Sequence, residues 1–447
     1  MELSMIFFVL YAAIVLAIGI VSSRKETEED FMIAERKVEG AQVAATMSAG
    51  MFDGATLAIY IAYVYQYGFS AIWIFVGACI GLLLLKKYAW RIKQKADELK
   101  VYSMPEYFFR VLGKRNGMMF SAILILEFFL LLVVNLIISS KILSAIFPVS
   151  YAVSAAIGGL IVASYLVLAG FKAVVRTDFF QLVVAFLMSV TVALFLFNKT
   201  TIPTSELNLG AMGAGNILGF LILAGFGAMI SPDLWQRTFA TRDERNLRRG
   251  LNYAVIILLA LGVVISVIGL STKVFFPNIL PEDALIVGFS QLLPFGLKEF
   301  GLVLLYAVAL SSSDTMTFTL SSIVTRDLKN YTRRYSEGSM RKMTRLSLVA
   351  FIACAVAVAI FYQDILALGF SFASLNLMLF PVVFGSLYWK LKEEAVFWSL
   401  VLGFGSVLVM FVAGVLTPET AVISLPVALV SLVVFQKTFG RGKEVAI

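Results

Sequence analysis

The sequence contains no histidine and only two cysteines among its 447 residues. A histidine proton relay is therefore excluded. A zinc site or a disulfide framework is poorly supported, because Cys79 and Cys354 both lie inside apolar segments. Charged residues are also scarce, at 14% against 60% hydrophobic residues, and the mean hydropathy is +0.93. This composition excludes a soluble protein and indicates a chain that crosses a lipid bilayer many times.

Long apolar runs separated by short charged loops predict an all-α polytopic membrane protein with about thirteen transmembrane helices. No stretch is left over for a soluble domain. The N-terminal run follows an acidic start and precedes a basic pair, so we predict a retained first helix rather than a cleaved signal. The predicted spans are centred near residues 13, 54, 80, 131, 159, 187, 223, 261, 312, 353, 376, 405 and 428.

The basic residues, which give a formal net charge of +8, are distributed unevenly between the two sides of these spans. If the first loop is cytoplasmic, the outer loops hold only Lys199, Lys273 and Lys298, and the inner loops hold the rest, including the group from Arg237 to Arg249. This asymmetry predicts a cell-membrane protein with its N-terminus outside and its C-terminus in the cytoplasm. It also explains the positive charge without nucleic acid.

The ninth span carries a stripe of oxygen-bearing groups in an otherwise apolar helix. Val308, Ser311, Ser312 and Thr315 repeat at the i, i+3, i+4, i+7 spacing of one helix face, and Asp314 lies beside them. Hydroxyls, carbonyls and a carboxylate suit a small hard cation. The alternative is that the hydroxyls only bond back to carbonyls four residues earlier. An intramembrane carboxylate favours a functional role.

Two spans are interrupted by helix-breaking residues. In the second span Gly50 and Gly54 flank Asp53, and in the seventh Gly225 and Gly227 precede a new helix start at 231–233, Ser-Pro-Asp. The breaks are five spans apart, which is typical of a transporter built from two inverted five-helix repeats. We predict a first helix at 4–22, repeats at 42–197 and 213–388, and two last helices at 395–436.

Four motifs resemble the sodium:solute symporter family. The segment 170–181, GFKAVVRTDFFQ, is similar to the family signature GxKAVxWTDxxQ, and 311–328 resembles the SSxDS…TRD helix. The segment 103–113, SMPEYFFRVLG, is similar to the TLPEYxxxRFG loop, and 231–239, SPDLWQRTF, to the GxPHxxxRF stretch. Two positions depart from the pattern: Arg176 replaces the signature Trp, and Asp233 stands in place of His.

The resemblance implies a leucine-transporter-type fold that carries a solute uphill with Na⁺ as coupling ion. Carried over by position, the sodium ligands are the backbone carbonyls of Met51, Gly54 and Val308 and the hydroxyls of Ser311 and Ser312. Asp178 matches the signature carboxylate. In the predicted orientation Asp314 and Thr315 lie one turn inward of Ser311, at a similar depth to Asp178. These three residues are predicted as a second cation or proton site.

Several of these residues have a simpler alternative. Thr177 and Asp178 are also consistent with a helix cap at the inner surface, and Asp53 with a cap of the second half-helix, as well as with gating or solute contact. Glu127 cannot pair with Lys141, which lies about 21 Å further along the same helix. We expect a structural or proton-linked role for Glu127 rather than direct solute contact.

The solute cavity is expected between the two breaks and the fourth, seventh and eleventh spans. A carboxylate such as Asp53 suits an amine, which favours uptake into the cytoplasm of an amino acid such as proline, with an organic acid also possible on this scaffold. Alternatives are a proton-coupled symporter or a solute-binding receptor; no nucleophile and base pair suggests an enzyme. The predicted solute contacts are Phe52, Asp53, Asn135, Phe226, Ser231, Trp235, Phe372 and Asn376.

Overall fold

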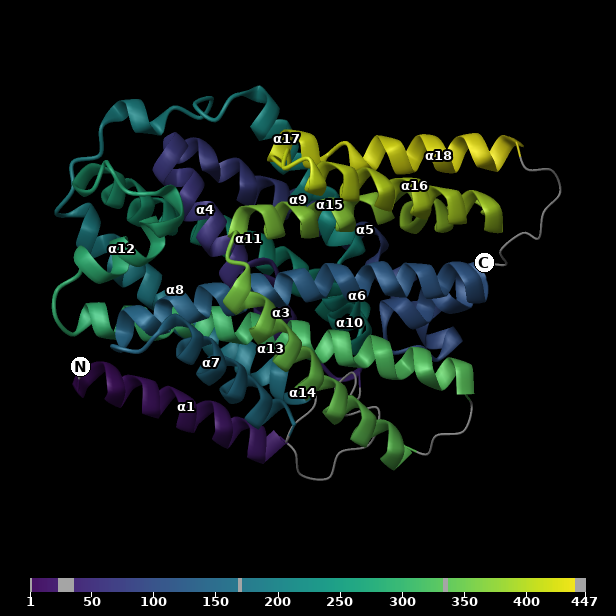
Figure 1. Cartoon of the computed structure of the whole chain (residues 1–447), viewed down its shortest axis with the longest axis horizontal. Helices are drawn as coiled ribbons and strands as arrows, with labels where there is room; N and C mark the ends of the chain where they lie inside the picture. Colours follow the sequence, from purple (N-terminus) through teal and green to yellow (C-terminus); the bar gives the residue numbers. More distant parts are fainter. Residues whose placement is uncertain (1, 23–35, 168–170, 333–336, 439–447) are drawn as a thin grey trace.

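The computed structural model describes residues 2–22, 36–167, 171–332 and 337–438. Over these residues the chain is helical, and the long helices run along one common direction (Figure 1). The predicted all-α class is therefore confirmed. Gly170 of the signature motif and the basic pair Arg24 and Lys25 lie outside the described residues.

The helices follow one another with short connections. The first half contains α1 (Glu2–Ser22), α3 (Gly40–Met51), α4 (Gly54–Tyr67), α5 (Trp73–Leu99), α6 (Met104–Ile146), α7 (Tyr151–Leu166) and α8 (Phe171–Phe197). The second half contains α9 (Ala214–Ile230), α10 (Pro232–Ala240), α11 (Glu244–Phe275), α12 (Ala284–Gln291), α13 (Leu297–Thr332), α14 (Glu337–Phe361), α15 (Ile365–Ser386), α16 (Glu393–Val412), α17 (Pro418–Ala421) and α18 (Ser424–Thr438).

All thirteen predicted span centres fall inside described helices. Nine helical segments of the described chain are long and apolar enough to cross a membrane, and a tenth is formed if the bent pair α9 and α10 is one span. One of the nine, Gly54–Leu99, contains two predicted spans, and the apolar parts of α1 and α7 are shorter than the others. The count of thirteen and the repeat boundaries therefore stay predictions.

Helix α13 lies at the centre of the molecule. Of its membrane-spanning window, 94% is buried, against 28% for α14 and 33% for α18 at the periphery. It packs against α6, α8 and α14, and α1 covers another of its sides. Polar side chains on α13 are thus shielded from lipid by other helices, which is the setting in which membrane proteins retain them.

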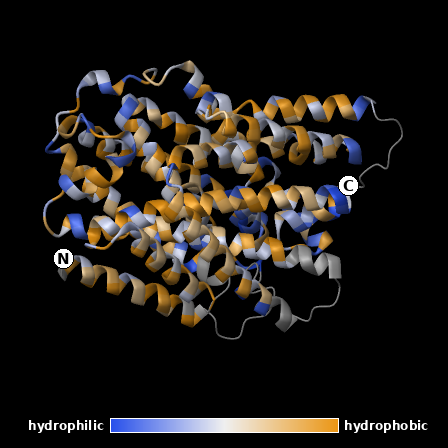
Figure 2. Cartoon of the chain, viewed as in Figure 1, coloured by the Kyte–Doolittle hydropathy of each residue, from blue (hydrophilic) through white to orange (hydrophobic). Residues whose placement is uncertain are grey.

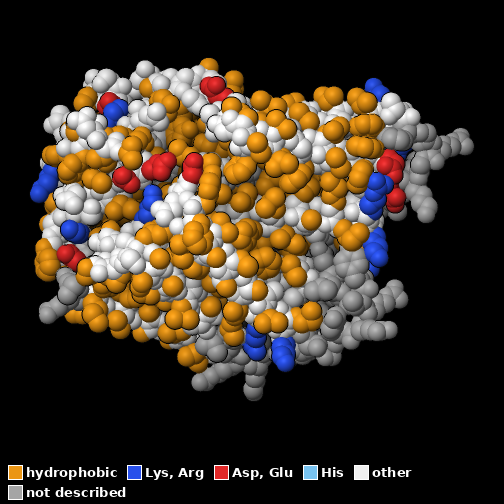
Figure 3. Space-filling model, in the orientation of Figure 1, with side chains coloured by type: hydrophobic (Ala, Val, Ile, Leu, Met, Phe, Trp, Pro, Cys, Tyr) orange, Lys and Arg blue, Asp and Glu red, His pale blue; other side chains and the backbone are white. Residues whose placement is uncertain are grey.

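The outer surface matches this arrangement. Apolar colouring runs along most helices in Figure 2, and apolar side chains cover most of the visible face in Figure 3. Lys and Arg side chains gather mainly toward the ends of that face (Figure 3). An apolar band with charges at its margins is what contact with a lipid bilayer requires.

Both predicted helix breaks are present. Helix α3 ends at Met51 and α4 begins at Gly54, while α9 and α10 meet at Ser231 with a bend of 46°. Pro232 occupies the first turn of α10, where a missing N–H costs nothing. Each break frees backbone carbonyls of one half-helix and N–H groups of the next inside the protein.

Candidate functional site

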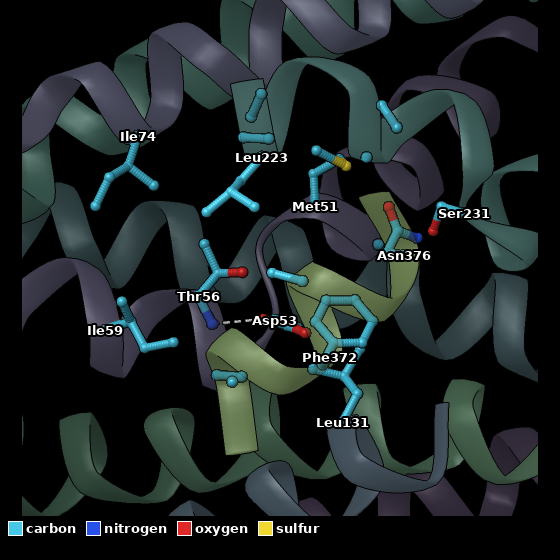
Figure 4. Close-up of a pocket in the computed structure, with 18 of the residues that line it drawn as sticks. Met51, Asp53, Thr56, Ile59, Ile74, Leu131, Leu223, Ser231, Phe372 and Asn376 are labelled. Carbon is cyan, nitrogen blue, oxygen red and sulfur yellow. Dashed lines mark hydrogen bonds between the residues drawn. The ribbon is translucent and has the colours of Figure 1, made fainter. Parts of the chain in front are cut away.

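A cavity of about 170 Å³ lies between the two broken helices and α15. This is room for several water molecules and thus for a small organic solute. In Figure 4 Ser231 and Asn376 lie next to each other, with Asp53 and Phe372 further along the wall. The polar residues that line the cavity are Asp53, Thr56, Ser231, Asp233 and Asn376. The rings of Phe75, Phe220, Phe370 and Phe372 contribute to its apolar wall.

Asp53 caps helix α4 at the first break. Its Oδ1 accepts a hydrogen bond of 2.6 Å from the backbone N–H of Thr56, so the capping role is confirmed. The same carboxylate belongs to the cavity wall. Asp53 therefore fixes the start of the half-helix and brings negative charge to the cavity, while its role in gating or solute contact remains a prediction.

Asp233 brings a second carboxylate to the cavity, from the second break. Its Oδ2 accepts a hydrogen bond of 2.8 Å from Arg237, and its Oδ1 accepts one from the hydroxyl of Ser231. Asp53 and Asp233 are the charged residues among those that line this cavity, and no Lys or Arg joins them in the described chain. Asp233, which stands where the family pattern has His, thus lies in the wall of the cavity that is predicted to hold the solute.

Four of the eight predicted solute contacts line the cavity: Asp53, Ser231, Phe372 and Asn376. The other four lie elsewhere in the described structure. Phe52 is buried against Phe75, with ring centroids 6.1 Å apart, and Phe226 stacks on Phe380 at 4.3 Å. Trp235 packs against Tyr107 and Phe108 and donates its indole N–H to the carbonyl of Met229 at 2.8 Å. Asn135 supports the first break, as described next.

The first break is held tightly against α6 and α13. The Asn135 side-chain oxygen accepts a hydrogen bond of 3.2 Å from the N–H of Ala55, which α4 itself leaves unsatisfied. A Cβ at Gly54 would lie 2.8 Å from the Cα of Ala309 and 2.8 Å from the Asn135 oxygen. Only glycine permits this approach, which brings the break beside the oxygen stripe of α13.

The hydroxyls of α13 divide into two groups. Ser312 donates to the carbonyl of Val308 at 3.0 Å and Ser313 to that of Ala309 at 3.0 Å, as the back-bonding alternative expects. Ser311 instead donates across the interface to Asp178 on α8, also at 3.0 Å. Back-bonding uses the hydroxyl proton of Ser312 and leaves its oxygen lone pairs for a cation.

A smaller cavity of about 20 Å³ lies at this interface. The predicted ion ligands Val308, Ser311 and Ser312 line it together with Asp178, and so does Gln181, whose buried Oε1 has no hydrogen-bond partner. An orphaned acceptor among hydroxyl and carboxylate oxygens fits a single small cation such as Na⁺. Met51 lines the larger cavity rather than this one. The described residues include no group of three His, Cys, Asp or Glu side chains suited to a transition metal.

A buried arginine connects the two cavities, and sequence reasoning missed it. Arg237 is only 1% exposed; it donates to Asp178 at 2.9 Å, to Asp233 at 2.8 Å and to Thr46 at 2.6 Å. Its assignment to an inner loop is wrong, because α10 continues past it to Ala240 inside the protein. The i, i+4 spacing of Asp233 and Arg237 was the available signal.

Asp178 lies in the interior of α8, which begins at Phe171, so the capping alternative for Thr177 and Asp178 is wrong. Its Oδ2 accepts from both Arg237 and Thr46 (2.8 Å), and its Oδ1 from Ser311. Thr315 is within 3.4 Å of both Arg237 and the buried Asp314. The second cation or proton site remains a prediction at a place where the guanidinium already brings one positive charge.

Glu127 lies behind the wall of the larger cavity. Its side chain is fully buried, and its Oε1 accepts a hydrogen bond of 2.6 Å from the side-chain amide of Asn376. Its Oε2 has no hydrogen-bond partner. Glu127 does not line the cavity itself, which is consistent with the expected absence of direct solute contact.

Solved structures confirm the fold. A Na⁺-coupled sialic acid symporter superposes with a TM-score of 0.84 over 100% of this chain and 99% of its own, at 17% identity. A manganese transporter from Eremococcus coleocola superposes with a TM-score of 0.56 over 92% of this chain and 96% of its own, at 14% identity. At these identities the likeness speaks for the fold alone.

Sequence comparisons point to one family. The osmoregulated proline transporter of Bacillus subtilis is 24% identical, over 91% of this chain and 88% of its own. A sodium/proline symporter of Staphylococcus saprophyticus is 26% identical, over 86% and 81%, and the sodium/pantothenate symporter of Haemophilus influenzae is 23% identical, over 91% and 90%. The model of the sodium:solute symporter family matches residues 31–403. The chain belongs to the sodium:solute symporter family and is a membrane transporter that couples Na⁺ to the movement of a solute.

Proposed function

We propose that this symporter carries a small amine-bearing solute, such as an amino acid of the size of proline, into the cytoplasm. The observation that carries the proposal is the charge of the cavity wall. Among the described residues that line the cavity, Asp53 and Asp233 are acidic and none is basic. Because Arg237 is paired with Asp233, Asp53 supplies the unbalanced negative charge, which favours a cationic nitrogen and disfavours a purely anionic acid.

The names of the relatives differ on this point. Two are proline transporters, whereas a third transports pantothenate, an anionic solute. The absence of a basic side chain among the described cavity residues favours the first kind of solute over the second. The aromatic wall suits a compact apolar ring or side chain next to the charged group.

We propose that Na⁺ is held at the interface of the first break with α13, by the carbonyls of Met51, Gly54 and Val308 and the hydroxyls of Ser311 and Ser312. The small cavity supports Val308, Ser311 and Ser312 as ligands, and the close approach of Gly54 to α13 supports the position of the break; Met51 lines the larger cavity instead. Asp178, Asp314 and Thr315 are retained as a second cation or proton site.

Arg237 provides a physical route for coupling the ion to the solute. Arg237 forms ion pairs with Asp178 and Asp233. Asp178 accepts a hydrogen bond from Ser311, one of the proposed sodium ligands, and Asp233 lines the proposed solute cavity. Sodium beside Asp178 competes with the guanidinium for that carboxylate, and an amine beside Asp233 competes for the other. Each ligand thereby changes the charge balance that the other one meets, which is what reciprocal coupling requires.

Uptake into proteoliposomes tests the proposal. A panel of labelled amino acids, organic acids and sugars is offered with an inward sodium gradient and, separately, with a matched proton gradient. Sodium-driven accumulation of an amino acid is the expected result. Accumulation of only an organic acid would contradict the solute class, accumulation driven only by protons would contradict sodium coupling, and binding without accumulation would indicate a receptor.

The topology part of the proposal has its own test. We propose an external N-terminus and a cytoplasmic C-terminus from the distribution of basic residues along the chain. Single cysteines placed near each terminus, in a chain whose Cys79 and Cys354 are replaced by alanine, would be labelled by an impermeant maleimide from opposite sides of the membrane. Labelling of both from one side would contradict it.

A further inference from the structure

We infer that Glu127 is a positioning residue for solute specificity: it orients the amide of Asn376 so that the cavity presents a hydrogen-bond acceptor to an amine N–H of the solute. This inference rests on the proposed uptake of an amine-bearing solute. It assigns a role to a buried carboxylate that neither the predicted ion site nor the Arg237 network uses.

The orientation follows from what each group can donate or accept. The NH₂ end of the Asn376 amide donates the 2.6 Å hydrogen bond to Glu127 Oε1. The carbonyl end then faces away from Glu127. A Cβ at Gly227 would lie 3.1 Å from this Oδ1, so the glycine of the second break leaves room for the oxygen at the cavity.

The other polar groups of the cavity also present hydrogen-bond acceptors. Asp53 and Asp233 accept, and Ser231 directs its proton to Asp233, which leaves its lone pairs as the exposed feature. Figure 4 shows Ser231 and Asn376 next to each other at one side of the cavity, with the amide nitrogen of Asn376 on the side of Ser231 and the amide oxygen turned away from it. An amine N–H of the solute satisfies the Asn376 oxygen, and a solute without N–H groups leaves this acceptor unpaired at a cost.

The position of Glu127 fits a role in orientation rather than in contact. It is fully buried one layer behind the wall, on α6, and Asn376 projects from the facing helix α15. An acidic side chain in a membrane interior is expensive to keep, and a purely structural partner for an amide does not need to be acidic. Glutamine would fill the same space but offers both a donor and an acceptor, so it would no longer fix which end of Asn376 the solute meets.

The test measures selectivity with paired solutes in the full-length protein. Sodium-driven uptake of L-proline and L-alanine is compared with that of cyclopentanecarboxylate and propionate, which keep the five-membered ring or the three-carbon chain and the carboxylate but lack the nitrogen. In Glu127→Gln we expect the KM for the amine-bearing member to rise about tenfold or more, with kcat nearly unchanged, so that the preference over its amine-free counterpart falls by that factor.

Two further variants separate positioning from stability. Asn376→Leu should lose the same preference, and the double variant with Glu127→Gln should lose no more than Asn376→Leu alone, because Glu127 acts through the amide. Ser121→Ala, at another buried polar side chain of α6 with an unpartnered oxygen, is the matched control and should keep the wild-type preference. Thermal stability of each variant is measured in parallel.

The outcomes distinguish this inference from the proposed function. A Glu127→Gln variant that keeps the wild-type preference, or a double variant that loses more than Asn376→Leu, would overturn the inference and leave sodium-driven amino-acid uptake intact. Equal wild-type uptake of the amine-bearing and amine-free members would also overturn it. If the wild type accumulates none of these solutes under a sodium gradient, the proposed function fails first.

Discussion

Single serine side chains on α13 allow the ion site to be tested directly. Removing the hydroxyl of Ser311 or Ser312 takes away one oxygen ligand without opening a large cavity, so we expect the sodium Kd to rise about tenfold or more, or ~1.4 kcal/mol, with little loss of thermal stability. Sodium-dependent quenching of tryptophan fluorescence or isothermal titration in detergent measures this affinity.

The adjacent Ser313 is the matched control. It is also buried on the same helix, and its hydroxyl bonds back to Ala309 at 3.0 Å as that of Ser312 does to Val308, but Ser313 does not line the small cavity. Ser313→Ala should therefore leave sodium affinity unchanged. If Ser311→Ala and Ser312→Ala also leave it unchanged, the proposed sodium ligands are incorrect.

We expect the largest loss of thermal stability from the replacement of Arg237. Arg237→Gln leaves two buried carboxylates, Asp178 and Asp233, without their shared cation, and such losses cost about 3–5 kcal/mol. The expected result is a clear fall in Tm in detergent. Neutralising one carboxylate as well, in Asp178→Asn with Arg237→Gln, should restore part of that Tm, because fewer unpaired charges remain.

The exposed Arg248 provides the control for charge removal. It pairs with Glu244 at 2.6 Å on the surface of the same half of the protein, and its side chain is 57% exposed. Arg248→Gln should change Tm very little, since exposed ion pairs contribute little. An Arg237→Gln variant as stable as Arg248→Gln would contradict the buried network.

Among the structural elements, the first broken helix depends most on a single residue. In Gly54→Ala the added methyl would meet backbone and side-chain atoms at 2.8 Å, so α4 must move away from α13. We expect a loss of about 1–3 kcal/mol in stability together with weakened sodium binding, because the proposed carbonyl ligands move with the break. Thermal melting and sodium titration of the same sample measure both effects.

Gly225→Ala is the matched control in the second broken helix. A Cβ there finds its nearest neighbour at 3.7 Å, an ordinary contact distance. We expect sodium affinity close to that of the wild type. Equal damage from both substitutions would mean that glycine content, rather than the close approach at Gly54, determines the stability of these helices.

The elements themselves could be read from the sequence, because their causes are local. The breaks follow from Gly50, Asp53 and Pro232, whose backbone preferences act within a few residues. Which side chains meet across helices could not be read in this way. A basic residue near the end of a span is expected in a loop, whereas the buried position of Arg237 depends on two carboxylates, one of them 59 residues away in the chain. Likewise, whether an aromatic side chain near a break, such as that of Trp235, lines a cavity depends on how the neighbouring helices pack.

At the scale of the whole molecule, the buried charges bear on how many ions accompany each solute. Asp178 and Asp233 together carry two negative charges when ionised, and Arg237 returns one positive charge, so this cluster has room for one further cation. With Asp314 neutral, a second sodium would leave a net positive charge in the membrane interior, which is costly. We therefore expect one sodium per solute, with the guanidinium acting as the cation of the predicted second site.

The ratio is measured from parallel fluxes of labelled sodium and labelled solute into proteoliposomes, or from the membrane potential at which net uptake stops. Asp178→Asn removes one negative charge next to Ser311 and should weaken the dependence of uptake on sodium while Arg237 remains paired with Asp233. Two sodium ions per solute in the wild type would contradict the charge argument. In that case Asp178, Asp314 and Thr315 would hold a cation of their own, and Arg237 would have to leave Asp178 when that ion binds.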